Sequence, residues 1–303
     1  MDGRERWGVL AAAASSLLGG SSVVATRLVI GELSPSTLGL LRFGIGTVCL
    51  MPLLYRTRRH RPARRDIIAI ALLGILFFAG FPWLFNAALS RTTAAHGALA
   101  LSILPLLTLG LGALMRREAV TRAKLAGILC AMIGIAFALS GRQPVGLLTN
   151  AGAGDLLMIG TAFCGALYNV LARPYLKRYP ALVFTTWAML AGTLALALLA
   201  AVDGSLAAAR PLSPSGWIVA IYLGIVGAAL TFWLWSYGLE HTTPTRVAVT
   251  VTLNPIMAMG LAVPLLGEPI SSRLVIGLVW VIAGIALAAW PLPPGRQPLP
   301  KLG

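Results

Sequence analysis

Charged residues are scarce in this sequence of 303 residues. Asp, Glu, Lys and Arg together make up 11% of the chain, whereas hydrophobic residues make up 58% and the mean hydropathy is +0.85. A soluble domain carries about 25% charged residues, so this chain has too few of them to cover a water-soluble globule of its size. The composition therefore predicts an integral membrane protein that is surrounded by lipid.

Cysteines and catalytic motifs are also few. Cys49, Cys130 and Cys164 each lie in an apolar run and form no CxxC pair, which excludes a disulfide framework and a cysteine-ligated zinc site. The sequence contains no HExxH, GxxxxGK[ST] or GxSxG motif. Its 9 acidic residues and 3 scattered histidines leave little material for acid–base or metal chemistry. No metal, no cofactor and no enzymatic activity are therefore expected.

Ten long apolar runs fill most of the chain. A helix that crosses the hydrocarbon core needs about 20 mainly apolar residues, and each run is close to that length. The stretches between them are too short for a soluble domain, so the expected fold is an all-α integral membrane protein with ten transmembrane helices. Thr243 and Pro244 are expected to begin the helix of the ninth run. The runs cover residues 7–30, 36–55, 66–89, 93–115, 123–140, 154–176, 180–201, 215–239, 243–266 and 272–290.

Positive charges outnumber negative ones by 24 to 9, which gives a net charge of +15. If the N-terminus is cytoplasmic, most of these cations fall in cytoplasmic segments, as the positive-inside rule requires. We therefore expect a multi-pass protein of a bacterial-type inner (plasma) membrane with both termini in the cytoplasm. The cations are divided among short segments that would contact anionic lipid, so no nucleic-acid partner is expected. Arg42, within the second run, is expected to reach toward the outer surface or a helix end.

The second half of the chain repeats the first. Because each half holds five of the expected helices, the second half would enter the membrane from the opposite side, as in the inverted-topology repeats of secondary transporters. The expected domains are residues 1–145 and 146–303, which enclose a central cavity. At a shift of 150 residues Leu73-Gly74-Ile75, Trp83, Thr92-Thr93, Pro105 and Glu118 meet Leu223-Gly224-Ile225, Trp233, Thr242-Thr243, Pro255 and Glu268, and at a shift of 146 residues Arg27 and Gly46 meet Arg173 and Gly192.

Three motifs, one of which occurs in both halves, carry a resemblance to a known family. They are the stretch Pro35 to Phe43 (PSTLGLLRF), the pair Asn254-Pro255, and an acid followed by spaced glycines, as in Glu118 with Gly127 and Gly134 and in Gly267-Glu268-Pro269 with Gly277 and Gly284. Over nearly its whole length the chain resembles the EamA family of the drug/metabolite transporter superfamily, and within it the aromatic amino-acid exporters. The resemblance implies a ten-helix carrier of small metabolites, with amino-acid export as the best-represented activity. Leu104 stands before Pro105 where Asn254 precedes Pro255, which departs from the internal symmetry.

Polar and aromatic residues inside the apolar runs are the candidates for substrate binding, because polar groups in a bilayer are costly. Aromatic walls with uncharged hydrogen-bonding groups suit an amphiphilic small-molecule cargo. Trp233 and Trp235 could equally face lipid, the prolines could simply kink helices, and His96 could lie outside the pathway. The candidates are Phe78, Pro82, Asn86, His96, Tyr168, Asn169, Trp233, Trp235, Tyr237, Thr250 and Asn254.

No Asp or Glu lies in the middle third of any expected helix. Proton-coupled antiport usually needs a buried carboxylate, so we expect a facilitator driven by the substrate gradient, with His96 as the one titrating candidate. Export of drugs or nucleotide-sugars remains an alternative, and a membrane-embedded enzyme is a further one, although clustered acids or a nucleophile with its base are missing. A monomer is the default expectation.

Overall fold

The computed structural model describes residues 3–29, 32–56, 62–89, 101, 103–139, 153–207, 211–266 and 272–289. Every regular element within these ranges is helical. This agrees with the expected all-α class, because a helix satisfies its own backbone hydrogen bonds in lipid. Each of the ten apolar runs contains helical residues, although residues 90–100 of the third connection and fourth run lie outside the described part of the chain.

Apart from the fourth run, whose described helix begins only at Leu104, the helices of the first half follow the expected boundaries closely. The elements Arg64–Gly74, Ile75–Gly80 and Phe81–Leu89 form one continuous helical run. The elements of this half are α1 (Gly3–Val29), α2 (Pro35–Arg56), α3 (Arg64–Gly74), η2 (Ile75–Gly80), α4 (Phe81–Leu89), α6 (Leu104–Leu114) and α7 (Arg122–Leu139).

The second half repeats this order. Its run from Pro214 to His241 is again continuous, and a short turn at residues 251–252 divides the ninth run into two helices. The elements are α8 (Ala153–Leu176), α9 (Ala181–Val202), α10 (Pro214–Gly224), η3 (Ile225–Leu230), α11 (Thr231–His241), α12 (Pro244–Thr250), α13 (Leu253–Leu266) and α14 (Ser272–Ala289).

Six of the described helical runs are long and apolar enough to cross a membrane. Their outer faces carry large apolar side chains, such as Leu72 at 62%, Leu198 at 68% and Ile218 at 71% exposure. So many exposed apolar groups would be unfavourable in water and are expected against lipid. The protein is therefore a multi-pass membrane protein. The six runs are Gly3–Thr26, Ser36–Leu54, Arg64–Phe85, Leu156–Leu176, Ala181–Val202 and Pro214–His241.

Two short π-helical segments occupy matching places in the two halves. η2 covers Ile75–Gly80 and η3 covers Ile225–Leu230, so they differ by the same 150 residues that relate the sequences. π-Helical turns are rare in proteins and are frequent at functional sites. Three successive residues are buried in each segment, namely 77–79 in η2 and 227–229 in η3.

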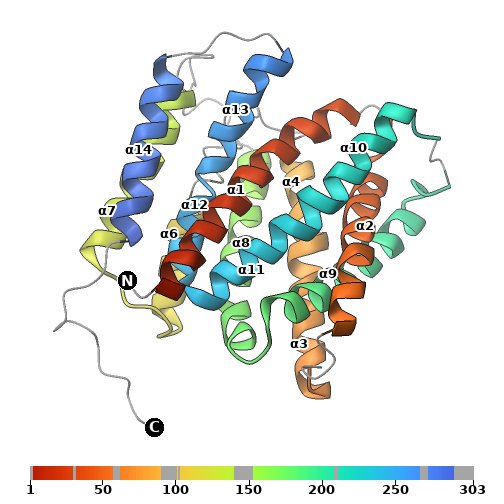
Figure 1. Ribbon diagram of the computed structural model, residues 1–303, viewed down its shortest axis with the longest axis horizontal. Helices are drawn as coiled ribbons and strands as arrows, with labels where there is room; N and C mark the ends of the chain where they lie inside the picture. Colours follow the sequence, from red (N-terminus) through yellow and green to blue (C-terminus); the bar gives the residue numbers. More distant parts are fainter. Residues whose placement is uncertain are drawn as a thin grey trace.

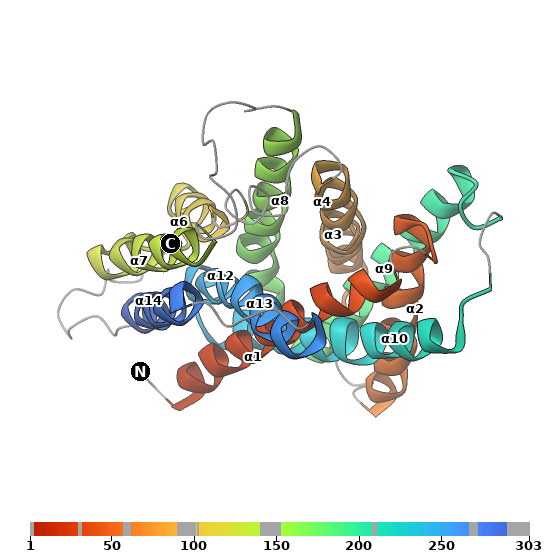
Figure 2. The ribbon, with the colours of Figure 1, turned by 90° about the horizontal axis from the view of Figure 1, so that it is seen from above.

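The helices form a bundle that is elongated along one axis. α7 and α14 lie side by side at one end of this axis, α2 and α9 lie at the other, and α1, α8 and α12 lie between them (Figures 1 and 2). α1 begins at the lower end of the bundle in Figure 1 and finishes at the upper end. We call these the proximal and the distal end.

The close helix contacts between the two halves occur in equivalent pairs: a contact of one half with the other has a counterpart in which the two halves swap places. A Cβ atom placed on Gly46 of α2 would lie 3.1 Å from the Gly224 carbonyl oxygen, and one on Gly192 of α9 would lie 2.8 Å from the Gly74 carbonyl oxygen. Gly192 corresponds to Gly46 and Gly74 to Gly224. The two close helix crossings are therefore equivalent, and both depend on glycine because a side chain would separate the backbones.

The crossing of α7 with α14 also consists of equivalent glycine contacts from the two halves. A Cβ atom on Gly127 would lie 2.6 Å from the Gly284 carbonyl oxygen, and one on Gly134 would lie 2.8 Å from the Gly277 carbonyl oxygen. Gly127 and Gly134 correspond to Gly277 and Gly284. The spaced glycines that were read from the sequence thus bring the last helix of each half together.

Candidate functional site

Aromatic rings from four elements meet in one buried core cluster, which we call the centre. Phe77 of η2 stacks on Tyr168 of α8 with ring centroids 4.0 Å apart. Phe78 of η2 makes edge contacts with Phe232 of α11 at 5.0 Å and with Phe43 of α2 at 5.5 Å. Phe78 and Tyr168 are fully buried. We call these five residues the aromatic cluster.

Polar side chains lie next to this cluster. The indole Nε1 of Trp235 donates a hydrogen bond of 3.1 Å to Asn169 Oδ1, and the Thr185 hydroxyl donates one of 2.6 Å to Ser236 Oγ. The Asn169 amide nitrogen is buried without a hydrogen-bond partner. A buried donor without a partner is unfavourable, and it offers a hydrogen bond to a molecule that enters this region.

A second polar group joins α1 to the other half. The hydroxyl groups of Ser16 and Thr250 are 2.9 Å apart, and Thr250 also donates to the Ala12 carbonyl at 3.1 Å. Ser15 donates to the Thr231 carbonyl at 2.7 Å. The serines of α1 are therefore bonded between helices as well as closely packed.

Asn254 lies one turn beyond Thr250, against α1. A Cβ atom on Gly19 would lie 3.2 Å from its amide nitrogen, and its Oδ1 is buried without a hydrogen bond. At the equivalent place in the other half, Leu104 packs on Gly165. The two halves thus share one packing geometry, but only one of them presents an amide there.

The predicted site residues separate into several groups in the structure. Phe78, Tyr168, Asn169 and Trp235 come together in the centre, where the Trp235 side chain is buried and does not face lipid. Thr250 and Asn254 lie against α1. Trp233 and Tyr237 are partly buried beside the centre, with rings 6.4 Å apart, and Pro82 is half-buried at the start of α4. The side chain of Asn86 and the whole of His96 lie outside the described part of the chain.

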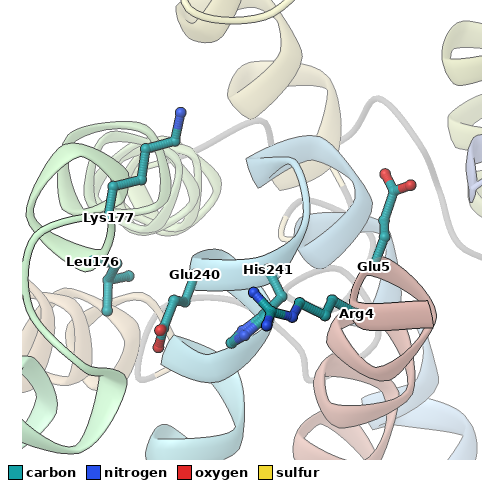
Figure 3. Close-up of a pocket in the computed structure, with 6 residues that line it drawn as sticks. All are labelled: Arg4, Glu5, Leu176, Lys177, Glu240 and His241. Carbon is teal, nitrogen blue, oxygen red and sulfur yellow. The ribbon is translucent and has the colours of Figure 1, made fainter. Parts of the chain in front are cut away.

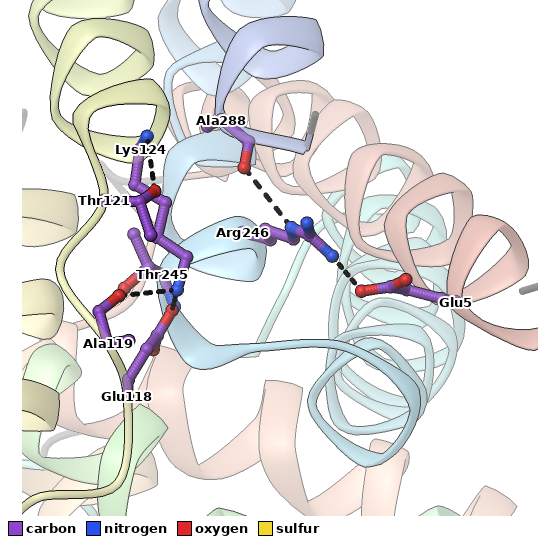
Figure 4. A network of polar contacts seen from close by, with 8 residues as sticks. All are labelled: Glu5, Glu118, Ala119, Thr121, Lys124, Thr245, Arg246 and Ala288. Atoms are coloured by element: carbon purple, nitrogen blue, oxygen red, sulfur yellow. Dashed lines mark hydrogen bonds and ion pairs between the residues drawn. The ribbon is translucent and has the colours of Figure 1, made fainter. Parts of the chain in front are cut away.

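At the proximal end, Glu118 links the two halves. Its carboxylate pairs with Lys124 Nζ at 2.7 Å and accepts a hydrogen bond of 3.2 Å from the Thr245 backbone nitrogen at the start of α12 (Figure 4). Pro244 takes the first helical position as predicted, but the Thr243 side chain makes no capping hydrogen bond. Thr243 therefore occupies the N-cap position as expected, but the side chain that accepts a hydrogen bond from the first turn is the Glu118 carboxylate of the other half.

Arg246 extends this network toward α1. Its guanidinium pairs with Glu5 and donates to the Ala288 carbonyl at 3.3 Å, as Figure 4 shows. α12 is thus tied at its first turn to α1, to α14 and to the segment between α6 and α7. These contacts close the proximal end of the bundle around α12.

A solvent-open hollow of about 490 Å³ lies beside this network. It is formed by the start of α1 and the last turns of α8 and α11, and the Arg4 side chain extends from α1 toward His241 (Figure 3). The imidazole of His241 stacks on Tyr237 at 4.1 Å. The lining side chains carry both signs of charge, which suits a polar entrance better than an apolar binding pocket. They are Arg4, Glu5, Leu176, Lys177, Glu240 and His241.

At the distal end, two carboxylates bind the connecting segments. Glu32 accepts hydrogen bonds of 2.9 Å from the Ser213 backbone nitrogen and hydroxyl. Asp203 follows α9 and accepts from the Ser205 backbone nitrogen and from the Ser36 hydroxyl, both at 2.8 Å. The hydrogen bonds from Ser205, followed by that from Ser36, hold the pKa of the Asp203 carboxyl below its usual value.

Arg42 does not reach the outer surface or a helix end, so that expectation was wrong. Its Nη2 donates a hydrogen bond of 2.6 Å to the Gly227 carbonyl in the middle of η3. Apolar periodicity does not predict the π segment η3. The Gly227 carbonyl of this segment, to which Arg42 donates, was therefore not expected as its partner. Sequence reasoning also missed Phe43, Phe77 and Phe232, although the pair Phe77-Phe78 at the centre of a polar-flanked run was a signal.

Comparisons with known proteins give a consistent picture. The model of the EamA-like transporter family matches residues 6–140 and 152–290. The uncharacterized transporter YyaM of Bacillus subtilis is 27% identical over 283 residues, which cover 90% of each chain. A probable terminal-alkyne amino-acid exporter of Streptantibioticus cattleyicolor is 26% identical and covers 88% of each chain. A crystal structure with 23% sequence identity superimposes with a TM-score of 0.77 over 93% of this chain and 96% of the other, which supports the fold.

Proposed function

Because the chain belongs to the EamA-like transporter family, we propose that it is a secondary transporter that exports amino acids, aromatic or other neutral ones, and related small metabolites. The observation that carries this proposal is the buried centre, where the aromatic cluster adjoins the Trp235–Asn169 hydrogen bond and an unbonded amide nitrogen. Such a centre offers a stacking surface together with a hydrogen-bond donor. The relative named as a probable amino-acid exporter supports the same cargo class.

The proposed architecture is ten transmembrane helices in two inverted five-helix repeats, residues 1–145 and 146–303, around a central cavity. The matching π segments and the exchanging glycine contacts support it. In transporters of this kind, one repeat moves against the other around a site at the membrane midplane. The aromatic cluster would be that site, since Phe43 and Phe77 come from the first half and Tyr168 and Phe232 from the second.

The proposed energy source is the gradient of the substrate itself. In the described part of the chain, the acidic residues lie at or near helix ends, as Glu5, Glu32, Glu118 and Glu240 do, and none lies in the aromatic cluster. Because the described residues of the centre include no carboxylate, we expect none of them to exchange a proton for cargo. Substrate efflux from proteoliposomes should therefore persist when ΔpH is clamped to zero, and its collapse under that condition would reject this part of the proposal.

We further propose that the protein works in the bacterial inner membrane as a monomer, with both termini in the cytoplasm, as a carrier and not as an enzyme. The proximal end, where α1 begins, would then face the cytoplasm. The mixed-charge hollow at this end would be the cytoplasmic entrance, next to the network around α12.

A transport panel tests the cargo. The purified protein is reconstituted into proteoliposomes, and counterflow of labelled phenylalanine, tryptophan, leucine and glutamate is compared with that of a drug and a nucleotide-sugar. We expect uptake of the neutral amino acids and its loss in Asn169→Leu, whereas Trp217→Phe, at an exposed position of α10, keeps it. Uptake of only the drug or the nucleotide-sugar would reject the amino-acid assignment.

A further inference from the structure

Arg42 is a cation placed within an apolar helix. It lies in the second turn of α2, and its Nη2 bonds to the Gly227 carbonyl at 2.6 Å. Among the described residues no carboxylate forms an ion pair with it, and its Nε is buried without a hydrogen bond. A guanidinium carries five donors, so one carbonyl leaves it poorly satisfied. An ionisable side chain in this setting marks a functional site by default.

The fold itself does not require the charge. The residue of the second half that corresponds to Arg42 is Ala188, and both make the same packing contact through their backbone. The Arg42 carbonyl lies against Gly224, and the Ala188 carbonyl lies against the equivalent Gly74. Alanine is therefore sufficient for this helix crossing, and the guanidinium serves a purpose that the repeat does not share.

The surroundings of the guanidinium provide several complementary groups. Its carbon lies 5.4 Å from the centroid of the Phe43 ring, and Phe43 contacts Phe78 and Phe232 in the aromatic cluster. The Ser22 hydroxyl oxygen of α1 lies against Gly227, 2.5 Å from the position that a Cβ atom on this glycine would take. One cation, one backbone carbonyl, one hydroxyl and one aromatic wall thus meet at the boundary of α1, α2 and η3.

We propose that Arg42 and the Gly227 carbonyl together recognise the zwitterionic head of an α-amino acid. The substrate carboxylate takes the guanidinium, for which paired N–H groups give a strong two-point contact. The Gly227 carbonyl, released from Arg42, accepts from the substrate ammonium group. The substrate side chain then lies on Phe43 and the rest of the aromatic cluster. This inference rests on the proposed function and specifies which chemical groups of the cargo are read.

Four related probes separate the recognition of each charge. L-Phenylalanine carries both groups, 3-phenylpropionate only the carboxylate, 2-phenylethylamine only the ammonium, and phenylalaninol lacks the carboxylate but keeps the amine. Binding to the purified protein is measured by ligand-induced thermal stabilisation, and transport by counterflow in proteoliposomes. We expect the wild type to bind phenylalanine tightest, 3-phenylpropionate more weakly, and the two amines not measurably.

The variant Arg42→Gln keeps a polar side chain of similar length and removes the charge. It should weaken binding of phenylalanine and 3-phenylpropionate by about 10- to 100-fold, the range for loss of a charge-assisted pair, and Arg42→Lys should restore part of it. The matched control Arg178→Gln removes a proximal cation that pairs with Asp66 at 3.5 Å, and it should leave both affinities unchanged. Should Arg42→Gln fail to fold, Arg42→Lys alone must still lower the affinity for carboxylates.

The outcomes separate the two proposals. Folded Arg42→Gln with wild-type affinity for both carboxylates would reject the role of Arg42 and leave amino-acid export standing. Wild-type preference for the amines would reject carboxylate recognition in the same way. Binding of 3-phenylpropionate that depends on Arg42, without transport of any amino acid, would support the recognition site and reject the proposed cargo. Absence of binding by all four probes would reject both.

Discussion

Asn169 shows at the scale of one residue how the centre is prepared for a ligand. It is fully buried, its Oδ1 accepts from Trp235 Nε1 at 3.1 Å, and its amide nitrogen has no partner. A half-satisfied buried amide costs free energy in the folded state. The stability that is lost at this residue can be recovered when a substrate supplies an acceptor, so ligand binding should stabilise the protein at this position.

The first prediction concerns Trp235. The change Trp235→Phe removes the indole N–H, leaves the Asn169 oxygen unbonded as well, and should lower the free energy of unfolding by about 1–3 kcal/mol. Trp233→Phe is the matched control, because Trp233 is only partly buried and its ring contacts Tyr237 at 6.4 Å. Unfolding in detergent, followed by intrinsic fluorescence or by loss of monodisperse protein, measures both. Equal effects of the two changes would show that the hydrogen bond contributes nothing.

The second prediction concerns the ion pair at the proximal end. The side chains of Lys124 and Glu118 are 9% and 1% exposed, so Lys124→Met leaves a buried carboxylate without its countercharge. Breaking such a pair on one side costs about 3–5 kcal/mol. The control Arg122→Met removes an exposed cation two residues away and should change stability by less than about 0.5 kcal/mol. A melting curve in which both variants match the wild type would contradict a structural role for Glu118.

Sequence reasoning could predict about half of the residues of the candidate site. Polar and aromatic residues inside apolar runs identified Phe78, Tyr168, Asn169 and Trp235, because such residues are unfavourable in lipid wherever they occur. Which side of a helix faces inward depends on the neighbouring helices, and this information is absent from a single run. Arg42 illustrates the limit, since its acceptor is a carbonyl 185 residues away in sequence.

At the scale of the element, the π segments explain why evenly spaced residues of one helical run differ in burial. The spacing of four residues between Phe78, Pro82 and Asn86 would place them on one face of a regular α-helix. η2 ends at Gly80, and its wider hydrogen-bond pattern changes the phase of the helix between Phe78 and Pro82. Phe78 is consequently buried, whereas Pro82 is only half-buried. The repetition of sequence between the two halves could be found from the sequence alone, but the local change from α-helix to π-helix could not.

The third prediction tests the α7–α14 crossing. A Cβ atom at Gly127 would lie 2.5 Å from the Ala288 backbone nitrogen, and a backbone atom there cannot rotate away as a side chain can. Gly127→Ala should therefore force the helices apart and cost about 1–3 kcal/mol, as overpacking does. Gly110→Ala is the matched control in α6, where nothing lies within 4 Å, and the better helix propensity of alanine should make it neutral or stabilising.

The two variants are compared by thermal unfolding in the same detergent. Gly284→Ala, at the reciprocal contact, should resemble Gly127→Ala, because each glycine meets the carbonyl of the other. Similar stability of Gly127→Ala and Gly110→Ala would mean that the two helices are not packed as closely as described.

At the scale of the whole molecule, the repeated sequence and the exchanging contacts have one physical origin. Two similar halves of a chain can pack with an approximate two-fold relation when each offers the same small residues to the other. Gly74 meets α9, and Gly224 meets α2, through equivalent atoms. Residues that break this relation need separate explanations, and Arg42 against Ala188 and Asn254 against Leu104 are two that place a polar side chain in one half only.

The last prediction concerns how the bundle sits in the membrane. The distribution of Lys and Arg favours a cytoplasmic proximal end, and two exposed alanines report on the two ends. Ala63 precedes α3 at the proximal end, and Ala207 follows α9 at the distal end. In a variant whose three native cysteines are replaced, Ala207→Cys should react with an impermeant maleimide in intact cells, because it would face outward. Ala63→Cys should react only after the cells are permeabilised. The opposite pattern would invert the orientation and make the mixed-charge hollow an external entrance, and labelling of both in intact cells would contradict the placement of the two ends on opposite sides of the membrane.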